Sequence, residues 1–398
     1  MGQTLEEIAQ QLHAANRKVQ LIYAFNGTGK TRLSRALKDL IAPKGEDGQE
    51  GELSREKILY YNAFTEDLFY WNNDLQGDGD AKLVTQPNTF TEWILAEQGQ
   101  EANITKNFQR YANDKLTPTF NQEYIVQTKD ELGQEKEVVI KAFSEVTFSI
   151  EAGGNEETGN FKISKGEESN FIWSIFFTLL EEVVSVLSIA EIDDRPTEQF
   201  NGLQYVFVDD PVSSLDENHL IELAVDLADL IKAAPHQLKF VITTHNALFY
   251  NVLHNELDLK QKGKKEGCYL LERFEYGSFS LNVKYGDANK SFSYHLHLKK
   301  VLEEAIAGNA IERYHFTLLR NLYEKTAGFL GYERWSDLLD TVEGSKDAYV
   351  RAINTFAHSA LSNAQVRDPS PAEKNTVKVL LENLVNNYAY WQQDEKNG

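Results

Sequence analysis

A glycine-rich segment near the N-terminus carries residue types that bind phosphate in other proteins. It reads Ala-Phe-Asn-Gly-Thr-Gly-Lys-Thr over residues 24–31 and follows the short apolar run Val19–Tyr23. Its glycines would let backbone N–H groups point at phosphate oxygens, assisted by the positive end of a helix expected from Arg32 to Leu40. The expected phosphate-binding residues are Asn26, Gly27, Thr28, Gly29, Lys30 and Thr31, with the Thr31 hydroxyl as a ligand of Mg²⁺. Alone, the segment also fits an ordinary glycine-rich turn, because Ala24 replaces the first glycine of the P-loop pattern.

Two carboxylates and a histidine follow apolar runs that predict buried strands. Asp209 and Asp210 follow Tyr205–Val208, and His245 follows Leu238–Thr244. The carboxyl ends of parallel strands meet at one edge of an α/β sheet, where ligands bind. There Asp209 would hold Mg²⁺ through its water shell, and Asp210 would orient or deprotonate the attacking water. Without a P-loop, these residues also fit a turn at a strand end and a solvent-exposed histidine.

The C-terminal third contains a second group of candidate residues. Arg320 and Glu324 are four apart and so lie on one face of the helix predicted over 311–330. The simpler interpretation of Arg320 and Glu324 is an exposed ion pair, which stabilises a helix by roughly 0.2–0.5 kcal/mol and has no further role. His358 lies in the last turn of a later predicted helix, where a buried, hydrogen-bonded histidine is the common explanation.

The stretch from residue 284 to residue 325 reverses the acidic bias of the chain. It holds seven Lys or Arg against five Asp or Glu, together with His295, His297 and His315. Such a stretch could bind an RNA phosphate backbone, while a charge-mixed helical surface is the simpler alternative.

Composition limits the class of protein. The chain has 398 residues and a net charge of −21, which argues against a nucleic-acid binder that ignores sequence. One cysteine, Cys268, excludes an intramolecular disulfide framework and fits a reducing compartment. The most apolar stretch, Phe171–Ala190, is interrupted by Glu181 and Glu182, and no secretory signal opens the chain. We therefore expect a cytoplasmic protein without membrane contact.

The elements that must position these residues form two predicted domains. An α/β domain with a P-loop core is expected over residues 1–264, with insertions at about 43–56 and 74–150. Residues 265–398 are expected to form a mainly helical domain that opens with a hairpin, Cys268–Phe274 and Ser278–Tyr285. Its predicted helices cover residues 294–307, 311–330, 345–356 and 371–391.

The order of the motifs resembles that of ATP-binding-cassette ATPases. After the P-loop come Ile163-Ser-Lys-Gly-Glu167, Asp209-Asp210, Ser214-Leu215-Asp216 and His245. This resemblance implies a head-to-tail homodimer with two nucleotides at its interface, or a higher oligomer of such dimers. The implied signature, which would cap the γ-phosphate held by the opposite protomer, comprises Ser164, Gly166 and Glu167, with Asp216 also at the nucleotide.

Three positions depart from the cassette pattern. Asp210 stands where many members carry glutamate and is one methylene shorter, which suits a slow switch better than a motor. Lys165 replaces the usual glycine of the signature. No glutamine is clearly placed between P-loop and signature, and Asn62, after the apolar run Ile58–Tyr61, is the candidate for that position.

Across its whole length the chain resembles the bacterial tRNA anticodon nucleases of the PrrC type. The segments that carry this resemblance are Ala24–Ser34, Tyr61–Trp71, Ser164–Asn170, Asp209–Asp216, Lys284–Asp287, Ser291–His297 and Arg320–Lys325. The resemblance implies an antiviral RNase that cuts tRNA-Lys on the 5′ side of the wobble base. It further implies Mg²⁺ with ATP or GTP, gating by nucleotide hydrolysis, dTTP as a regulatory nucleotide and silencing by a type I restriction–modification complex.

The same resemblance assigns residues to the nuclease. By position it places catalysis on Arg320, Glu324 and His358, and binding of the anticodon stem-loop on Lys284, Asp287, Ser291 and Tyr294. The implied products, a 2′,3′-cyclic phosphate and a 5′-hydroxyl, arise when the 2′-OH attacks its own phosphate, so no metal is expected for RNA cleavage. Glu324 and His358 would then serve as acid and base in either order, and Arg320 would stabilise the phosphorane. Arg351 is a rival for the phosphate-binding role.

Two other functions remain open from the sequence. One is a cassette ATPase of the DNA-repair or chromosome-maintenance class with a C-terminal docking module. No long heptad-patterned coiled coil separates P-loop from signature, which argues against it. The other is a nucleotide sensor without turnover, which the presence of Lys30, Thr31, Asp209, Asp210 and His245 argues against.

Overall fold

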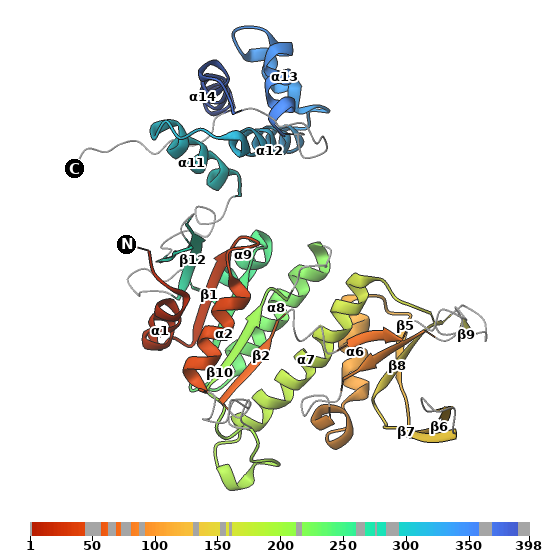
Figure 1. Cartoon of the computed structure of the whole chain (residues 1–398). Coiled ribbons are helices and arrows are strands. Elements are labelled where there is room, and N and C mark those ends of the chain that lie inside the picture. Colours follow the sequence, from red (N-terminus) through yellow and green to blue (C-terminus); the bar gives the residue numbers. More distant parts are fainter. Residues whose placement is uncertain are drawn as a thin grey trace. The chain divides into compact units, whose positions relative to one another are not determined.

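The computed structural model divides the chain into two compact units, Met1–Ser291 and Phe292–Gly398 (Figure 1). Each unit has its own hydrophobic core. The residues that the structure describes are 2–43, 57–62, 69–72, 81–86, 92–129, 135–151, 157–158, 161–211, 217–259, 267–274, 277–283, 294–357 and 368–388.

A six-stranded sheet forms the centre of the first unit, in the order β13-β12-β1-β11-β10-β2. All neighbouring strands pair in parallel except β12 and β13. Their runs of Val, Ile, Leu and aromatic residues are typical of strands buried on both faces. The strands are β1 (Val19–Ala24), β2 (Ile58–Tyr61), β10 (Tyr205–Asp209), β11 (Lys239–Thr244), β12 (Cys268–Arg273) and β13 (Phe279–Val283).

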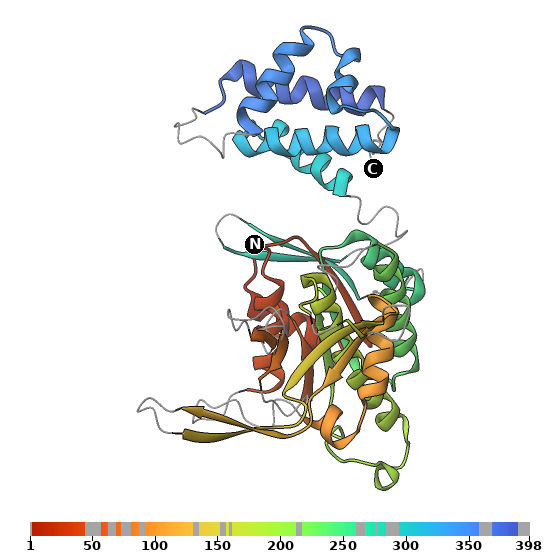
Figure 2. The ribbon, with the colours of Figure 1, turned by 90° about the vertical axis from the view of Figure 1, so that its right-hand side faces the viewer.

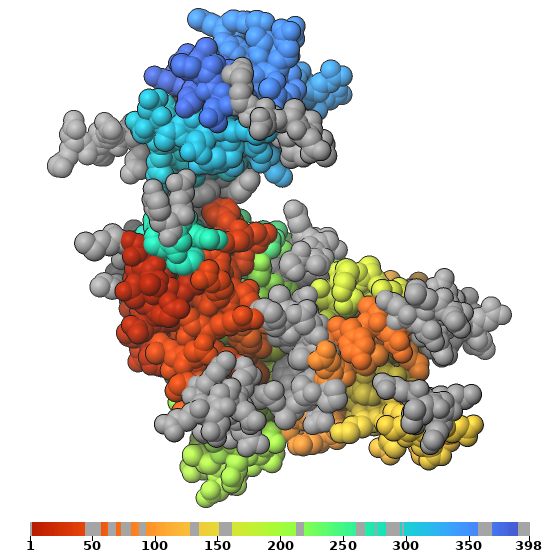
Figure 3. All heavy atoms as spheres, in the orientation of Figure 1, coloured from red at the N-terminus to blue at the C-terminus, as the bar shows by residue number. Residues whose placement is uncertain are grey.

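Helices cover both faces of this sheet. On one face, α1 (Leu5–Ala15) and α2 (Lys30–Ile41) bury Ile8, Leu33 and Leu37 against the strands, and these two helices form an exposed side of the unit (Figure 3). On the other, Tyr250 of α9 (Ala247–Glu256) contacts Tyr23 of β1 edge to face, and α8 (Glu217–Ala233) packs beside α9. The predicted α/β core is therefore confirmed.

A second sheet follows β2 in the chain, in the order β3-β4-β8-β5 with β9 paired to β8. It begins at Phe69, before the start expected for the insertion at residue 74, and the expected insertion at 43–56 lies almost wholly outside the described residues. Between its strands come a π-helix, η1, the helix α6, and a ribbon of β6 and β7 that extends from the unit (Figure 2). The bounds are β3 (Phe69–Asn72), β4 (Lys82–Thr85), η1 (Glu92–Glu97), α6 (Glu101–Tyr111), β5 (Leu116–Phe120), β6 (Tyr124–Lys129), β7 (Glu135–Ile140), β8 (Glu145–Glu151) and β9 (Glu157–Thr158).

The longest described helix, α7 (Lys165–Ser188), belongs to the core of the first unit. It is long and apolar enough to cross a membrane, but 78% of its most apolar window is buried within the protein. Phe171 packs against Phe108 of α6 and Phe148 of β8 in the second sheet, and Trp173 contacts Tyr61 of the central sheet. Hence α7 joins the two sheets through one aromatic core. A short 3₁₀ turn, η2 (Ile192–Asp194), follows it.

The second unit is helical, as predicted. Its central helix α12 (Arg313–Leu330) packs against the others and ends at Gly331, whose φ of 81° requires the conformational freedom of glycine. The other elements are α11 (Tyr294–Ala307), η3 (Trp335–Thr341), α13 (Lys346–Ala357) and α14 (Pro371–Asn387). Leu302, Phe316, Leu319, Leu322 and Leu380 are completely buried in its core.

The boundary between the units lies later than the sequence predicted. The hairpin β12–β13 was expected to open the helical domain, but β12 pairs with β1 through four residue pairs, from Leu21↔Cys268 to Ala24↔Leu271. The first unit therefore continues to Ser291, and the expected boundary at residue 265 is wrong. The misassignment has a simple cause, because a hairpin signal predicts local pairing and does not identify the sheet that the hairpin joins.

Two phenylalanines of α12 test this packing. We expect Phe316→Ala to lower the free energy of unfolding by about 3–5 kcal/mol, because a fully buried ring leaves a cavity. Phe329→Ala should change it by less than about 0.5 kcal/mol, because that side chain is 88% exposed. Urea unfolding of both variants, followed by circular dichroism, measures the difference. Equal losses would contradict the orientation of α12.

Candidate nucleotide and nuclease sites

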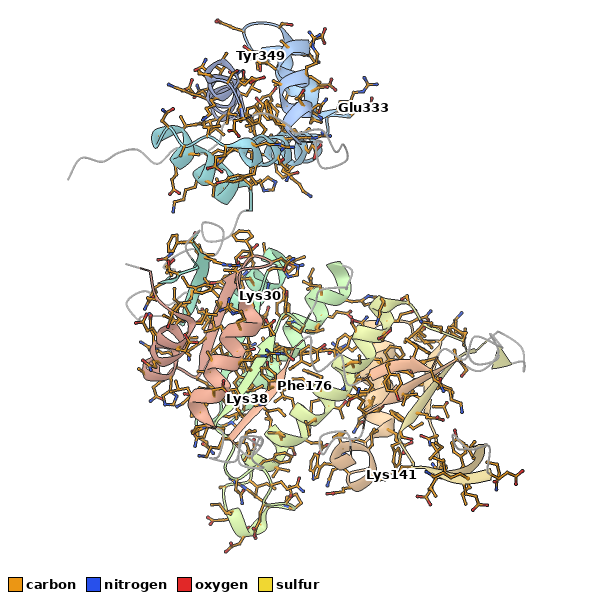
Figure 4. The ribbon with its side chains drawn as sticks, in the orientation of Figure 1. Lys30, Lys38, Lys141, Phe176, Glu333 and Tyr349 are labelled. Carbon is orange, nitrogen blue, oxygen red and sulfur yellow. The ribbon has the colours of Figure 1, made fainter. Side chains whose placement is uncertain are left out.

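The P-loop joins β1 to α2 at the carboxyl edge of the central sheet. Gly27 and Gly29 have φ values of 77° and 103°, the left-handed region that glycine adopts without strain. Lys30 opens α2 (Figure 4), and its ammonium group donates to the carbonyl of Ala24 and to Oδ1 of Asn26, each at 3.2 Å. The loop thus closes around the lysine although Ala24 replaces a glycine, because that position does not need a positive φ.

Thr31 and Asp209 lie together beside this loop. Thr31 Oγ1 donates to Asp209 Oδ2 at 2.7 Å, and Thr243 Oγ1 donates to the other carboxylate oxygen. Burial raises the pKa of Asp209 in spite of these two hydrogen bonds. A buried carboxylate that prefers to be neutral gains from a nearby cation, so the hydroxyl and carboxylate form a fitting oxygen donor set for Mg²⁺.

Asp210 lies between the side chains of Lys30 and His245. Its Oδ2 lies 3.3 Å from Lys30 Nζ and contacts His245 Nδ1, while the backbone N–H of His245 donates to Oδ1. Burial alone would raise the pKa of Asp210, but the hydrogen bonds from His245 and the charge of Lys30 outweigh it and lower this pKa. The backbone of Asp210 has a φ of 53° and is fixed by its N–H bond to the carbonyl of Thr243 at 2.9 Å.

These contacts bring together most of the residues predicted for the nucleotide site. Lys30, Thr31, Asp209, Asp210 and His245 come from three strand ends and meet at one edge of the sheet. The set fits a triphosphate with Mg²⁺, because it offers one ammonium group, backbone N–H groups and a pair of oxygen ligands. Asp216 lies outside the described residues.

The predicted signature begins a helix. Ser164 caps α7: the Glu167 N–H donates to its hydroxyl at 3.3 Å, and the Ser164 N–H donates to the Glu167 carboxylate at 2.8 Å. Lys165, where the signature usually has glycine, donates to the buried carboxylate of Glu168 at 2.6 Å. Trp71 Nε1 donates to the same carboxylate at 2.8 Å. Ser164 and Glu167 therefore have a capping role in this chain, and a role at a second nucleotide stays a prediction.

Asn62, the candidate for the missing glutamine, directly follows β2 at the same sheet edge. It is completely buried, and its amide donates to the hydroxyl of Tyr60, which also shares a hydrogen bond of 3.0 Å with Ser34 of α2. These contacts connect the end of β2 to the P-loop helix.

In the second unit, three groups among the described residues hold Arg320. Its Nε donates to Glu324 Oε1 at 2.7 Å, its Nη1 donates to Asn354 Oδ1 at 3.1 Å, and its guanidinium carbon lies 5.8 Å from the ring centroid of Trp335. The Arg320 side chain is 19% exposed and that of Glu324 is 41% exposed. The pair is therefore more than a solvated surface ion pair, because α12, α13 and η3 all fix the guanidinium.

The remaining nuclease predictions are only partly covered by the structure. His358 directly follows α13 and lies outside the described residues, as do Lys284, Asp287 and Ser291. Tyr294 is the first residue of α11. Arg351, the rival phosphate ligand, is exposed, and its Nε donates to the carbonyl of Asp347 in its own helix at 3.2 Å.

The basic stretch is partly neutralised along α11. Lys299 pairs with Glu303 at 2.7 Å, and Lys300 pairs with Glu304 at 3.5 Å. Burial and the charge of Lys325 lower the pKa of His295, which therefore favours the neutral imidazole. Described residues of this stretch thus agree with the simpler alternative of a charge-mixed helical surface.

Four residues that contact the predicted groups were not themselves predicted: Thr243, Thr244, Asn354 and Trp335. Thr243 and Thr244 could have been found, since they are the last residues of the predicted strand that ends before His245 at this sheet edge. Asn354 and Trp335 gave no signal, because their contact with Arg320 depends on how α13 and η3 pack against α12.

Comparisons with known proteins identify the family. Residues 150–384 match the family model of an AAA domain. The curated anticodon nuclease of Escherichia coli is 56% identical over 425 aligned residues, and the alignment covers 100% of both chains. This chain belongs to the anticodon nuclease family. The family thus joins a P-loop ATPase fold to a helical C-terminal region in one chain, as the motifs predicted.

Likenesses among solved structures are weaker. An Smc head bound to the C-winged helix domain of ScpA has a TM-score of 0.32 and 10% identity, covering 70% of this chain and 93% of that chain. The SMC head domain from Thermotoga maritima has a TM-score of 0.29 and 12% identity, covering 68% of this chain and 90% of that chain. TM-scores this low add nothing to the argument.

The neighbouring carboxylates Asp209 and Asp210 should respond to substitution in opposite ways. Asp210→Asn should lower the free energy of unfolding at neutral pH by about 1–3 kcal/mol, because it loses charge-assisted bonds to Lys30 and His245. Asp209→Asn should leave the free energy of unfolding unchanged or raise it, because it removes a buried carboxyl group whose pKa is raised by burial. Urea unfolding of both variants measures this, and a larger loss for Asp209→Asn would contradict it.

Acid pH should remove the stabilisation that the ionised side chain of Asp210 provides. A carboxyl group whose pKa is lowered by folding stabilises the protein above its unfolded pKa, at about 4, and loses that contribution as the pH falls through the folded value. The difference between wild type and Asp210→Asn should therefore persist from pH 7 to about 4 and shrink below it. Urea unfolding in steps of pH gives the profile.

Proposed function

We propose that the protein is a nucleotide-gated tRNA anticodon nuclease that cuts tRNA-Lys on the 5′ side of the wobble base. The observation that carries the proposal is the 56% identity to the Escherichia coli anticodon nuclease over the full length of both chains. A match of that extent includes both compact units, so the proposal covers an NTPase and an endoribonuclease in one chain.

The first unit is the nucleotide-responsive part of this proposal. Thr31 and Asp209 would hold the Mg²⁺ of a bound ATP or GTP, and this ion would offset charge on the phosphate oxygens. Lys30 turns from Asp210 to the phosphates, and Asp210, still held by His245, orients or deprotonates the attacking water. Ser164, Gly166, Glu167 and Asp216 would complete the site across a head-to-tail homodimer, and dTTP is the proposed regulatory nucleotide.

The second unit carries out the cleavage. The RNA 2′-OH attacks the adjacent phosphorus, the bond from phosphorus to the 5′-oxygen breaks, and a 2′,3′-cyclic phosphate and a 5′-hydroxyl form. The carboxylate of Glu324 is 41% exposed and forms an ion pair with Arg320. A carboxylate accepts protons, so we assign the 2′-proton to Glu324 and protonation of the leaving 5′-oxygen to His358. Arg320 stabilises the charge on the phosphorane, and no metal takes part.

The anticodon stem-loop of tRNA-Lys is the proposed substrate, with Lys284, Asp287, Ser291 and Tyr294 as its binding residues. We further propose an antiviral role in the cytoplasm, in which a type I restriction–modification complex keeps the nuclease silent. The family resemblance supports this regulation, and the contacts among Lys30, Thr31, Asp209 and Asp210 support its dependence on nucleotide.

Mapping of RNA ends tests the nuclease directly. Purified protein incubated with total bacterial tRNA, GTP and Mg²⁺ should give one cut beside the wobble position of tRNA-Lys, with a cyclic phosphate end. His358→Ala and Arg320→Ala should reduce the cleavage rate by a factor of about 10² or more. Once the protein has been activated with nucleotide, excess EDTA should leave the cut unchanged, because the 2′-OH is the nucleophile.

A Lys30→Ala variant separates the two activities in the same assay. It should lose nucleotide hydrolysis and, with it, nucleotide-stimulated cleavage, because Lys30 is the cation of the P-loop. Phe329→Ala, an exposed change in the second unit, is the control that should behave as wild type. Absence of tRNA cleavage by wild type under every nucleotide condition would overturn the nuclease assignment and leave an NTPase with an unknown output.

Asn354 and Trp335 should act as positioning residues for Arg320. We expect Asn354→Ala to lower kcat for RNA cleavage roughly tenfold with little change in KM, because the guanidinium loses a fixed orientation. Trp335→Phe keeps an aromatic ring under the guanidinium, so its kcat should be close to that of wild type. Trp335→Ala removes the ring, so its kcat should be lower. Urea unfolding followed by circular dichroism serves as the control for folding of the second unit. Normal cleavage by Asn354→Ala would show that the hydrogen bond has no catalytic effect.

A further inference from the structure

The P-loop has a second side that carries none of the catalytic carboxylates. In the central sheet, β11 and β10 lie on one side of β1, and β12 lies on the other. Asp209 ends β10, and Asp210 and His245 directly follow β10 and β11, so the γ-phosphate end of a nucleotide belongs on that side. Because a nucleotide is longer than the loop that binds its phosphates, its nucleoside must extend towards β12.

The carboxyl end of β12 lies beside the P-loop. Ala24, the last residue of β1, pairs with Leu271, which places Arg273 next to the loop itself. The Nη1 atom of Arg273 donates to the carbonyl oxygen of Gly27 at 3.5 Å, and the side chain is exposed. A guanidinium at this point would meet the phosphates that the loop binds, and arginine is well suited to phosphate oxygens.

The β12–β13 hairpin is fixed against the loop. Phe279 of β13 is buried, and its ring lies 3.4 Å from the point where a Cβ on Gly29 would stand. The guanidinium carbon of Arg32, in the first turn of α2, is 5.8 Å from the centroid of the same ring. The backbone of Phe279 exchanges two hydrogen bonds of 2.8 Å with Gln3. Arg273 therefore lies on a hairpin whose position beside the loop is fixed.

An exposed aromatic side chain follows the arginine. Phe274 is 48% exposed, although its backbone is fixed by the bond from its N–H to the carbonyl of Ser278 at 2.8 Å and by that from the Gly277 N–H to its own carbonyl at 3.0 Å. An apolar ring that is open to water on a fixed backbone offers a stacking surface, and every nucleobase has a flat face that can stack on it.

We propose that the β12–β13 hairpin is the nucleoside side of the nucleotide site: Arg273 binds the phosphates and Phe274 stacks on the base. This inference rests on the proposed binding of a nucleoside triphosphate by the P-loop. It assigns the ligand contacts to a hairpin that sequence alone placed in the helical domain, and it makes the stacking tolerant of the base.

Binding to the full-length protein in the presence of Mg²⁺ tests both contacts, with ATP, GTP and inorganic triphosphate as probes in titration calorimetry. Phe274→Ala should weaken ATP and GTP roughly fivefold or more and leave inorganic triphosphate unchanged, because only the base is lost. Arg273→Ala should weaken all three roughly tenfold. Phe274→Trp should bind the nucleotides at least as well as wild type, since it keeps the stacking surface.

Two variants serve as matched controls. Lys141→Ala also removes one positive charge from the first unit, at a position well separated from Lys30 (Figure 4). Phe329→Ala also removes an exposed phenylalanine. Both should bind all three probes as wild type does.

The outcomes separate this inference from the proposed function. Lack of binding by wild type would remove the proposed nucleotide site itself. Binding by wild type, with loss in Lys30→Ala but none in Arg273→Ala and Phe274→Ala, would overturn the role of the hairpin alone. Equal weakening of ATP and inorganic triphosphate by Phe274→Ala would show that the ring does not stack on the base.

Discussion

The parallel pairing of β1 and β10 with the strand between them, β11, is the constraint on which the nucleotide site depends. Residues that have no function alone lie at the strand ends: the P-loop after β1, two carboxylates at the end of β10 and a histidine after β11. Because the strands run in the same direction and in a fixed register, these residues meet at one edge. A slip of one residue in β10 would turn Asp209 away from Thr31 and Thr243.

The charges at this edge are balanced within the protein. Lys30 is nearly buried, and Asp210 and the carbonyl of Ala24 both compensate for its lost hydration. A triphosphate that takes Lys30 must therefore separate it from Asp210, while His245 keeps the carboxylate in place. Under the proposed function, nucleotide binding would thus change the charged partners of Asp210, and such a change could couple hydrolysis to RNA cleavage.

In the second unit, the candidate site depends on how three elements pack around Arg320. Arg320 lies on α12, yet its guanidinium is fixed by Asn354 of α13 and Trp335 of η3 as well as by Glu324 of its own helix. Packing of these three elements on a common apolar core fixes the direction of one charged group. An arginine held in this way loses little side-chain entropy when it meets a phosphate, which suits the catalytic role proposed for Arg320.

The sequence by itself determined the elements and the kinds of chemistry. Apolar runs predicted β1, β10 and β11, and helical periodicity predicted α11 to α14, because these patterns are local in the sequence. The glycines, Lys30 and the two aspartates indicated a phosphate site, because each motif is a short stretch of characteristic residue types. Only the tertiary structure decided which elements meet. It assigned the β12–β13 hairpin to the central sheet, brought Thr243 to Asp209, and placed Asn354 and Trp335 around Arg320. Those contacts join residues far apart in the chain through strand pairing and helix packing, and no short stretch of sequence encodes them.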